Sequence, residues 1–299
     1  MISVHPFNNN IGDYKMKKVI KVLTTALLAI FTVVGVQAQS GKTLTFGFVP
    51  GPYVDLFKLG IKPGLVKKGY KIEIKEFTDW VTPNIALANN EINVNIFQHS
   101  RYLKKFSEDK GLKLSGVITI PTASFEIYSK KLKARNPEQL KKELKPGNVV
   151  TIPNDPTNLA RALVFLRNTG LITIKAKIDA TKASEKDIDK NPYGLVFKPV
   201  EAAQLPRTLE SVTFSVISGN YAIAAGLKLS SGIARERLNQ DIIITIAVRS
   251  EDLNKQFIKD IISVVQSSDF KAVVENPTYV FHQFERPEWY VRKWGIKNR

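Results

Sequence analysis

The sequence predicts an α/β protein whose chain forms two lobes with a ligand cleft between them. Three observations lead to this prediction. Segments that alternate as strands do are followed by helical segments, this rhythm starts twice along the chain, and no low-complexity linker separates the two rounds. With 299 residues, of which 43% are hydrophobic and 24% charged, the chain can bury one large core or two medium ones.

The first round of elements begins after residue 42. Residues 43–49 alternate as a strand does and end at the turn Pro50-Gly51-Pro52. A helical stretch follows, and we expect Pro63 and Gly64 to interrupt it. Thr82-Pro83 is typical of an N-cap followed by the first helical residue. The remaining expected elements are a strand over 70–77, a helix over 82–88, a strand over 92–97 and a helix over 102–110.

The second round begins near Phe125. Asn136-Pro137 is a typical helix start, and Gly170 is suited to closing a helix. Residues 242–248 are so evenly apolar that they predict a central strand covered on both faces. The strand and helix alternation favours mostly parallel sheets. The expected elements are helices over 136–144, 158–169, 252–266 and 269–274, and strands over 149–152, 212–218 and 242–248.

Residues 1–38 form a leader that contains a signal for export. The segment 16–21 is basic and 22–34 is apolar. Val36-Gln37-Ala38 has small residues at the two positions that a signal peptidase reads, so we expect cleavage after Ala38. Residues 1–15 lack such features, and we expect the true start at Met16. The alternative, an uncleaved membrane anchor, is less favoured because a membrane crossing needs ~20 apolar residues.

The cysteine and charge content argue against several classes of protein. The absence of cysteine rules out a disulfide, a thiolate metal site and a lipid-anchoring cysteine, so we expect a free periplasmic protein. The formal net charge is +17, and it becomes +14 when the four Lys and one Asp of residues 1–38 are removed. The basic residues are spread along the chain and are not interleaved with aromatics in one block, so nucleic-acid binding is not expected.

Candidate ligand contacts are sought just after the predicted strand ends, because ligand sites favour the crevice at the carboxyl ends of parallel strands. Asn158 and Arg161 follow one such strand, at the start of a predicted helix. A helix start favours anions, and the planar guanidinium of arginine suits a carboxylate. We place Arg161 in the first helical turn, where a cation opposes the helix dipole. The alternative is an arginine that pairs with a surface acid.

Four further side chains, Trp80, Phe97, His99 and Tyr102, can form an apolar wall that suits a thioether. His99 is interpreted as a packing or hydrogen-bonding residue, because no cysteine and no acidic motif accompanies it. The only other histidine after the leader is His282, which argues against a histidine-rich metal site. Neither a GxGxxG motif nor a phosphate-binding loop occurs, and no cofactor is expected.

Over nearly the whole segment from Gly41 to Val274, the chain resembles the NlpA/MetQ lipoproteins, which are substrate-binding components of methionine ABC transporters. The most specific likenesses are Trp80-Val81-Thr82-Pro83-Asn84-Ile85-Ala86-Leu87, Asn95-Ile96-Phe97-Gln98-His99, Ile127-Tyr128-Ser129-Lys130-Lys131, Arg161-Ala162-Leu163 and Gly219-Asn220-Tyr221-Ala222. The resemblance implies a type II periplasmic-binding-protein fold with two chain crossings. We expect lobe 1 over 39–126 and 237–299 and lobe 2 over 127–236.

The resemblance also implies roles for individual residues. Trp80, Phe97, His99 and Tyr102 match the family's side-chain pocket, whereas Gln98 is interpreted as structural. Arg161 matches the carboxylate clamp, and Asn158 and Asn220 match the polar contacts to the amino-acid backbone. The expected ligand is methionine, delivered by a monomer to an ABC permease and its ATPase.

The chain also departs from the family pattern. Asn239-Gln240-Asp241-Ile242 stands where relatives carry a Tyr-x-Asn element, and the lipid-anchoring cysteine is absent. Another apolar amino acid or a methionine-containing dipeptide is therefore an alternative ligand. Alternatives of other classes are an envelope interaction protein that has lost transport and an exported enzyme. The enzyme is disfavoured because no nucleophile, metal set or carboxylate pair is apparent.

Overall fold

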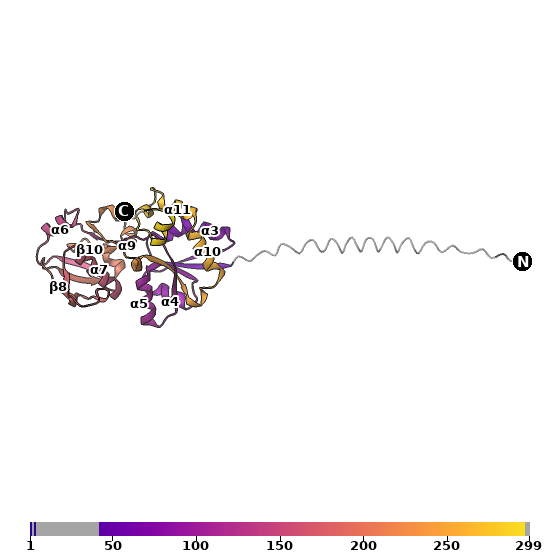
Figure 1. Cartoon of the computed structure of the whole chain (residues 1–299), viewed down its shortest axis with the longest axis horizontal. Coiled ribbons are helices and arrows are strands. Elements are labelled where there is room, and N and C mark those ends of the chain that lie inside the picture. Colours follow the sequence, from indigo (N-terminus) through magenta and orange to yellow (C-terminus); the bar gives the residue numbers. More distant parts are fainter. Residues whose placement is uncertain (2, 4–41, 297–299) are drawn as a thin grey trace. The chain divides into compact units, whose positions relative to one another are not determined.

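The computed structural model describes residues 1, 3 and 42–296. The predicted signal and cleavage site lie outside the described residues, as does the expected start at Met16. The described residues from Lys42 onward belong to one compact unit, which Figure 1 colours from indigo to yellow. Two five-stranded sheets with their flanking helices divide this unit into two lobes.

Lobe 1 is built on the sheet with strand order β2-β1-β3-β12-β4. Strand β12 comes from the C-terminal part of the chain, so indigo and yellow segments meet in this lobe (Figure 1). Its strands are β1 (Thr43–Phe48), β2 (Lys71–Glu76), β3 (Val94–His99), β4 (Leu114–Thr119) and β12 (Ile244–Arg249). Its longer helical segments are α2 (Tyr53–Leu56), the π-helix η1 (Phe57–Ile61), α3 (Lys62–Lys67), α4 (Thr82–Ala88), α5 (Ser100–Lys110), α10 (Gln256–Val265), α11 (Ser268–Glu275) and α12 (Glu288–Trp294).

Lobe 2 is built on the sheet with strand order β11-β5-β10-β6-β9. Its strands are β5 (Phe125–Tyr128), β6 (Val149–Pro153), β9 (Val196–Val200), β10 (Phe214–Ser218) and β11 (Ala234–Arg235), and β7 (Thr173–Ile174) and β8 (Ile188–Lys190) form a separate pair. Its helices are α6 (Pro137–Glu143), α7 (Pro156–Asn168), α8 (Leu205–Thr208) and α9 (Gly219–Ala224). The chain crosses between the lobes twice, after β4 and after β11, which confirms the predicted two-lobed α/β fold.

In each sheet four of the five strands run in the same direction and one strand is reversed, so the sheets are mostly parallel, as expected. β12 runs antiparallel to β3 and β4, and β5 runs antiparallel to β10 and β11. The reason is the double crossing: β3 ends at the inter-lobe side, and β12 enters lobe 1 from that same side when the chain returns. The predicted central position of residues 242–248 is confirmed, because β12 lies between two strands and is buried throughout. The lobe boundaries stay a prediction, with β5 beginning at Phe125 and β11 ending at Arg235.

Two predicted helix boundaries need correction. The chain remains helical from Tyr53 to Lys67 through the π-helix η1, so Pro63 does not interrupt it. Pro63 stands in the first turn of α3, where a proline leaves no hydrogen bond unmade. Thr82 lies inside α4 and does not cap it, because the carboxylate of Asp79 accepts hydrogen bonds from the backbone N–H groups of Val81 and Thr82, at 2.7 and 2.8 Å.

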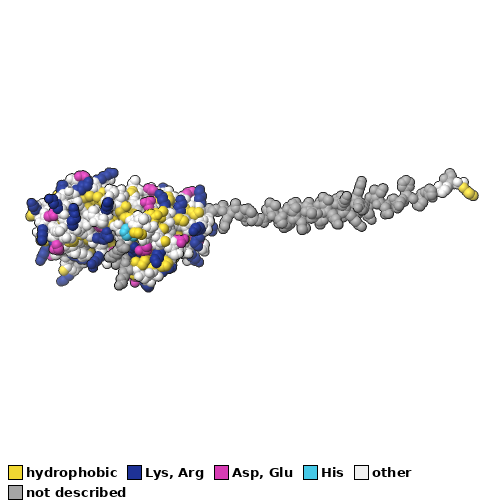
Figure 2. All heavy atoms as spheres, turned by 90° about the horizontal axis from the view of Figure 1, so that it is seen from above, with side chains coloured by type: hydrophobic (Ala, Val, Ile, Leu, Met, Phe, Trp, Pro, Cys, Tyr) yellow, Lys and Arg dark blue, Asp and Glu magenta, His cyan; other side chains and the backbone are white. Residues whose placement is uncertain are grey.

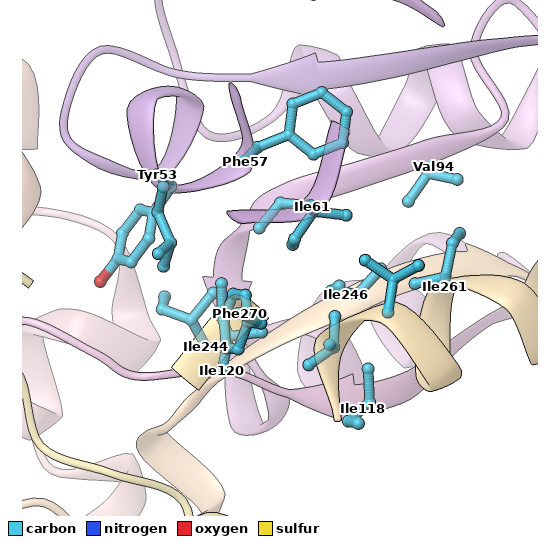
Figure 3. Close-up of a cluster of buried hydrophobic side chains, with 14 of the residues drawn as sticks. Tyr53, Phe57, Ile61, Val94, Ile118, Ile120, Ile244, Ile246, Ile261 and Phe270 are labelled. Atoms are coloured by element: carbon cyan, nitrogen blue, oxygen red, sulfur yellow. The ribbon is translucent and has the colours of Figure 1, made fainter. Parts of the chain in front are cut away.

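The largest hydrophobic core lies in lobe 1, between its sheet and the helices that cover it. Figure 3 shows Phe57 and Ile61 from η1 in the same cluster as Val94, Ile246 and other apolar side chains. The ring of Phe57 lies between those of Phe46 and Phe48, with centroid distances of 4.4 and 5.2 Å. A separate core in lobe 2 is formed chiefly by α7 and strands β5, β6 and β10. Each lobe therefore has its own apolar interior, which lets the two lobes act as separate walls of a cleft.

The excess of basic residues is spread over the surface. Figure 2 shows Lys and Arg side chains across the visible face of the compact unit, with Asp and Glu among them. Some of them form ion pairs, such as Lys75 with Glu91 at 3.1 Å and Lys68 with Asp260 at 3.0 Å. Exposed pairs such as Lys75 with Glu91 contribute at most about 1 kcal/mol each. On this face the basic side chains do not gather into one stripe of the kind that binds nucleic acid.

Candidate functional site

A cavity lies between the lobes, beside the end of β3 and the starts of α7 and α9. The cavity volume is about 30 Å³, within about 370 Å³ of space between atoms that is partly open to solvent. All seven side chains predicted as ligand contacts line it, and so does Gln98. The complete lining is Tyr53, Trp80, Phe97, Gln98, His99, Tyr102, Thr122, Ala123, Phe125, Asn158, Arg161, Ser218, Asn220 and Ile244.

Arg161 is the only lining residue of this cavity that carries a fixed charge, and it is buried. Its Nε lies 2.9 and 3.1 Å from the two carboxylate oxygens of Glu236, and its Nη2 lies 2.6 Å from Oε2. The guanidinium carbon also lies 3.8 Å from the centre of the Phe125 ring. The partner of Arg161 is therefore a buried glutamate and not the surface acid considered as an alternative.

The placement of Arg161 in the first turn of its helix is wrong. Asp155 caps α7 and Pro156 is its first residue, so Arg161 lies in the second turn. The misplacement arises because Pro156 and Thr157 are already helical, a start that the Asp155 carboxylate fixes by accepting a hydrogen bond from the N–H of Asn158 at 2.9 Å. The argument that a cation in the first helical turn opposes the helix dipole therefore does not apply to Arg161. Its contacts with Glu236 and Phe125 hold it beside the cavity.

Asn158 and His99 join the two lobes across the cavity. The Nε2 of His99 lies 3.1 Å from Oδ1 of Asn158, and Nδ1 of His99 accepts the backbone N–H of Tyr102 at 3.0 Å. Because Nδ1 accepts a hydrogen bond, the neutral ring carries its proton on Nε2, which donates a hydrogen bond to Oδ1 of Asn158. The Nδ2 of Asn158 in turn donates to Asp155 at 3.1 Å. His99 is therefore a hydrogen-bonding residue, as the sequence led us to expect, and it also caps α5, which was not predicted.

Burial holds the pKa of His99 well below its usual range, and the nearby positive charge of Arg161 lowers it further. In the unfolded chain the ring takes up a proton as the pH falls through about 6.5, whereas in the folded chain it stays neutral. Folding stability is therefore lost on acidification below this pH, at about 1.4 kcal/mol per pH unit for this one group.

This effect can be measured by comparing wild type with His99→Gln. We expect the difference in unfolding free energy between the two proteins to shrink by about 1–2 kcal/mol as the pH is lowered from 7 to 5. The carboxyl groups with raised pKa, such as Asp155, are present in both proteins and cancel in the difference. Urea unfolding at several pH values measures it, and a difference that does not change with pH would contradict a buried neutral His99.

The aromatic side chains form a continuous wall from lobe 1 to lobe 2. The Trp80 ring stacks on Tyr221 at 5.3 Å and meets Tyr102 edge-on at 6.2 Å. Tyr102 also meets Phe97 edge-on at 6.4 Å, and its hydroxyl donates to the carbonyl of Trp80 at 3.2 Å. Among the described residues, the indole Nε1 of Trp80 and the Oγ of Ser218 are buried and have no hydrogen-bond partner. Ser218 lines the cavity, so its hydroxyl is available to a ligand.

Asn220 is a second residue that joins the two lobes. Its Nδ2 donates to the carbonyl of Pro50 in lobe 1 at 3.2 Å. A Cβ atom on Gly51 would lie 2.8 Å from the Cβ of Asn220 and 2.9 Å from its carbonyl oxygen, so only glycine permits this approach. The amide of Gln98 is bound within a buried network with Asn84 and Asn95, which agrees with its structural interpretation.

Several residues near the cavity were missed from the sequence. Ser218 ends the predicted strand 212–218, and Tyr53 follows the turn after the predicted strand 43–49, so a search beyond strand ends could have found both. Glu236 pairs with Arg161, which lies 75 positions away, and no local sequence pattern indicates that contact. Across residues 1, 3 and 42–296, there is no group of three or more potential metal ligands and no helix long and apolar enough to cross a membrane.

Comparison with known proteins adds independent information. Residues 44–289 match the model of the NlpA lipoprotein family. Outer membrane lipoprotein 3 of Mannheimia haemolytica is 36% identical over 232 residues, which cover 77% of this chain and 86% of that protein. The D-methionine-binding lipoprotein MetQ of Salmonella typhi is 34% identical over 238 residues, covering 79% of this chain and 85% of that protein.

Solved structures are similar over the same region. A nutrient-binding protein from Burkholderia cenocepacia, bound to methionine, superposes with a TM-score of 0.72 and 33% identity, covering 78% of this chain and 95% of that one. The methionine-binding protein MetQ superposes with a TM-score of 0.73 and 31% identity, covering 80% of this chain and 95% of that one.

Proposed function

The chain belongs to the NlpA lipoprotein family, and we propose that it is an extracytoplasmic substrate-binding protein that delivers methionine to an ABC importer. The observation that carries the proposal is the inter-lobe cavity, in which a buried arginine faces an aromatic wall. Relatives named as D-methionine-binding and a similar structure with bound methionine support this choice of ligand.

The polar end of the cavity suits a zwitterion. The charge of Arg161 is balanced by Glu236, so a ligand that carries one positive and one negative group adds no net charge to the buried site. We propose that the Nη atoms of Arg161 bind the carboxylate, and that Asn158, Asn220 and the free hydroxyl of Ser218 contact the ligand's polar end.

The aromatic part of the lining suits the thioether. Trp80, Phe97, His99 and Tyr102 present ring faces and edges, and sulfur makes favourable contacts with aromatic rings. Methionine has about nine heavy atoms, and a ceiling of about 1.5 kcal/mol per atom permits roughly nanomolar binding if nearly every atom is contacted. Enclosure between two lobes achieves such contact, so we propose binding by lobe closure without turnover of the ligand.

Release of bound small molecules tests the proposal. Purified protein, residues 39–299, is denatured and the released compounds are identified by mass spectrometry. We expect about one methionine per chain, and nanomolar binding of added methionine by calorimetry. A different amino acid or a dipeptide would reassign the ligand within the binding-protein class. An empty cavity, with no thermal shift on adding methionine, would overturn the proposal and favour an envelope protein without transport; a chemically altered ligand would indicate an enzyme.

The proposed partners are an ABC permease and its ATPase, which a monomer meets in the periplasm. The relatives carry the name lipoprotein, whereas this sequence contains no cysteine. Release as a free protein after cleavage at Ala38 stays a prediction, because the leader lies outside the described residues.

A further inference from the structure

Glu236 lies behind the cavity wall, at the second chain crossing. It does not line the cavity, yet its carboxylate is buried and holds Nε and Nη2 of Arg161 from the side. A guanidinium has five N–H groups in a fixed plane, and this side-on contact uses only the Nε edge. Among the described residues, no hydrogen bond engages Nη1 of Arg161, so the end of the fork remains open for a second carboxylate.

Two contacts fix the plane and direction of that fork. Glu236 sets the direction through three short contacts of 2.6 to 3.1 Å, and the ring of Phe125 covers one face of the guanidinium at 3.8 Å. A side chain held in this way loses little further freedom when a ligand binds, and this lowers the entropic cost of binding. The fixed orientation of the guanidinium therefore favours a bidentate contact to the carboxylate of a ligand.

The same carboxylate also joins the two chain crossings. Oε2 of Glu236 accepts the backbone N–H of Phe125 at 3.1 Å, and the backbone N–H of Glu236 donates to the carbonyl of Phe125 at 2.9 Å. Phe125 ends the first crossing and Glu236 begins the second. Through Glu236, Arg161 is thus bound at the point where the two connections between the lobes contact each other.

We propose that Glu236 is a positioning residue for ligand recognition: it holds Arg161 at the crossings so that the Nη end meets the ligand carboxylate as the lobes close. This inference rests on the proposed function. A merely structural role, the neutralisation of a buried arginine, would lower stability when Glu236 is changed but would not alter how the protein discriminates between ligands.

Discrimination is measured with two ligands. Methioninol keeps the ammonium group and the thioether side chain of methionine but has a hydroxyl in place of the carboxylate. The ratio of the two dissociation constants therefore reports the contact to the carboxylate alone. In wild type we expect methionine to bind about a hundredfold more tightly than methioninol, which corresponds to about 2.8 kcal/mol.

The matched control is Glu126→Gln. Glu126 is a buried glutamate on the neighbouring strand β5, paired with Arg235 at 2.7 Å and with the hydroxyl of Tyr128 at 3.1 Å, and it does not contact Arg161. We expect Glu236→Gln to reduce the preference for methionine to about tenfold or less and Glu126→Gln to keep the wild-type preference. Calorimetry on folded protein, checked by circular dichroism, measures both.

A second variant decides the matter if Glu236→Gln fails to fold. Glu236→Asp keeps the negative charge, but its shorter arm does not reach Arg161 and the N–H of Phe125 together. Loss of the preference for methionine over methioninol in Glu236→Asp supports the role of Glu236 in positioning Arg161. A wild-type preference in either folded variant would overturn it, whereas the absence of methionine binding in wild type would overturn the proposed function itself.

Discussion

Replacing Arg161 with alanine is expected to weaken methionine binding by about 2–5 kcal/mol, or roughly 30-fold to several thousand-fold. The reason is that the ligand carboxylate would enter a buried cavity that offers no other cation, since Arg161 is the only lining residue with a fixed charge. A desolvated carboxylate without a partner costs more than the loss of an exposed ion pair. Calorimetric titration with methionine measures the change.

The control for this variant lies on the same helix. Arg167→Ala removes an exposed arginine of α7 whose hydrogen bonds, at 3.1 and 3.2 Å, go to the neighbouring Asn168. Its dissociation constant should stay within about twofold of wild type, since surface changes away from the site are nearly neutral. Because Arg161→Ala also leaves Glu236 without its partner, binding is compared only for protein with a native circular dichroism spectrum. A wild-type affinity in folded Arg161→Ala would refute the carboxylate clamp.

Phe57→Ala is expected to lower the free energy of unfolding by about 3–5 kcal/mol. Phe57 is fully buried in the lobe 1 core (Figure 3). Its ring contacts the rings of both Phe46 and Phe48. Alanine would leave a cavity there and remove both ring contacts. The midpoint of urea unfolding should fall accordingly. Leu59→Ala is the control, because Leu59 belongs to the same π-helix but is 41% exposed, and it should change stability by at most about 0.5 kcal/mol.

The positions of the candidate site residues could be predicted because they follow strand ends. His99 ends β3, Asn158 follows β6, and Asn220 follows β10. In α/β sheets the side chains at such ends face a common crevice, so a correct reading of the strands was enough to bring these residues together. Their roles toward a ligand remain proposals, since a strand-end position indicates where a side chain lies and not what it binds.

Features that depend on distant parts of the chain could not be predicted. The antiparallel direction of β12 follows from the double crossing, and an alternating or apolar pattern carries no strand direction. Pro63 is a helix breaker in most interior positions, yet here the preceding π-helix ends just before it and no N–H is missed. Arg161 lies on α7 and Glu236 follows β11, 75 positions further along the chain, so no local sequence pattern indicates their pairing.

The position of β12 has a consequence for the order in which the molecule can be assembled. Strands β3 and β4 do not touch each other in the sheet, because β12 lies between them and pairs with both. All strands of lobe 2 precede β12 in the chain, so lobe 2 is available to fold as soon as its continuous segment emerges. Lobe 1 must wait for residues 244–249 before β4 has a neighbour. During synthesis, lobe 1 is therefore the first lobe to emerge and the last to complete its sheet.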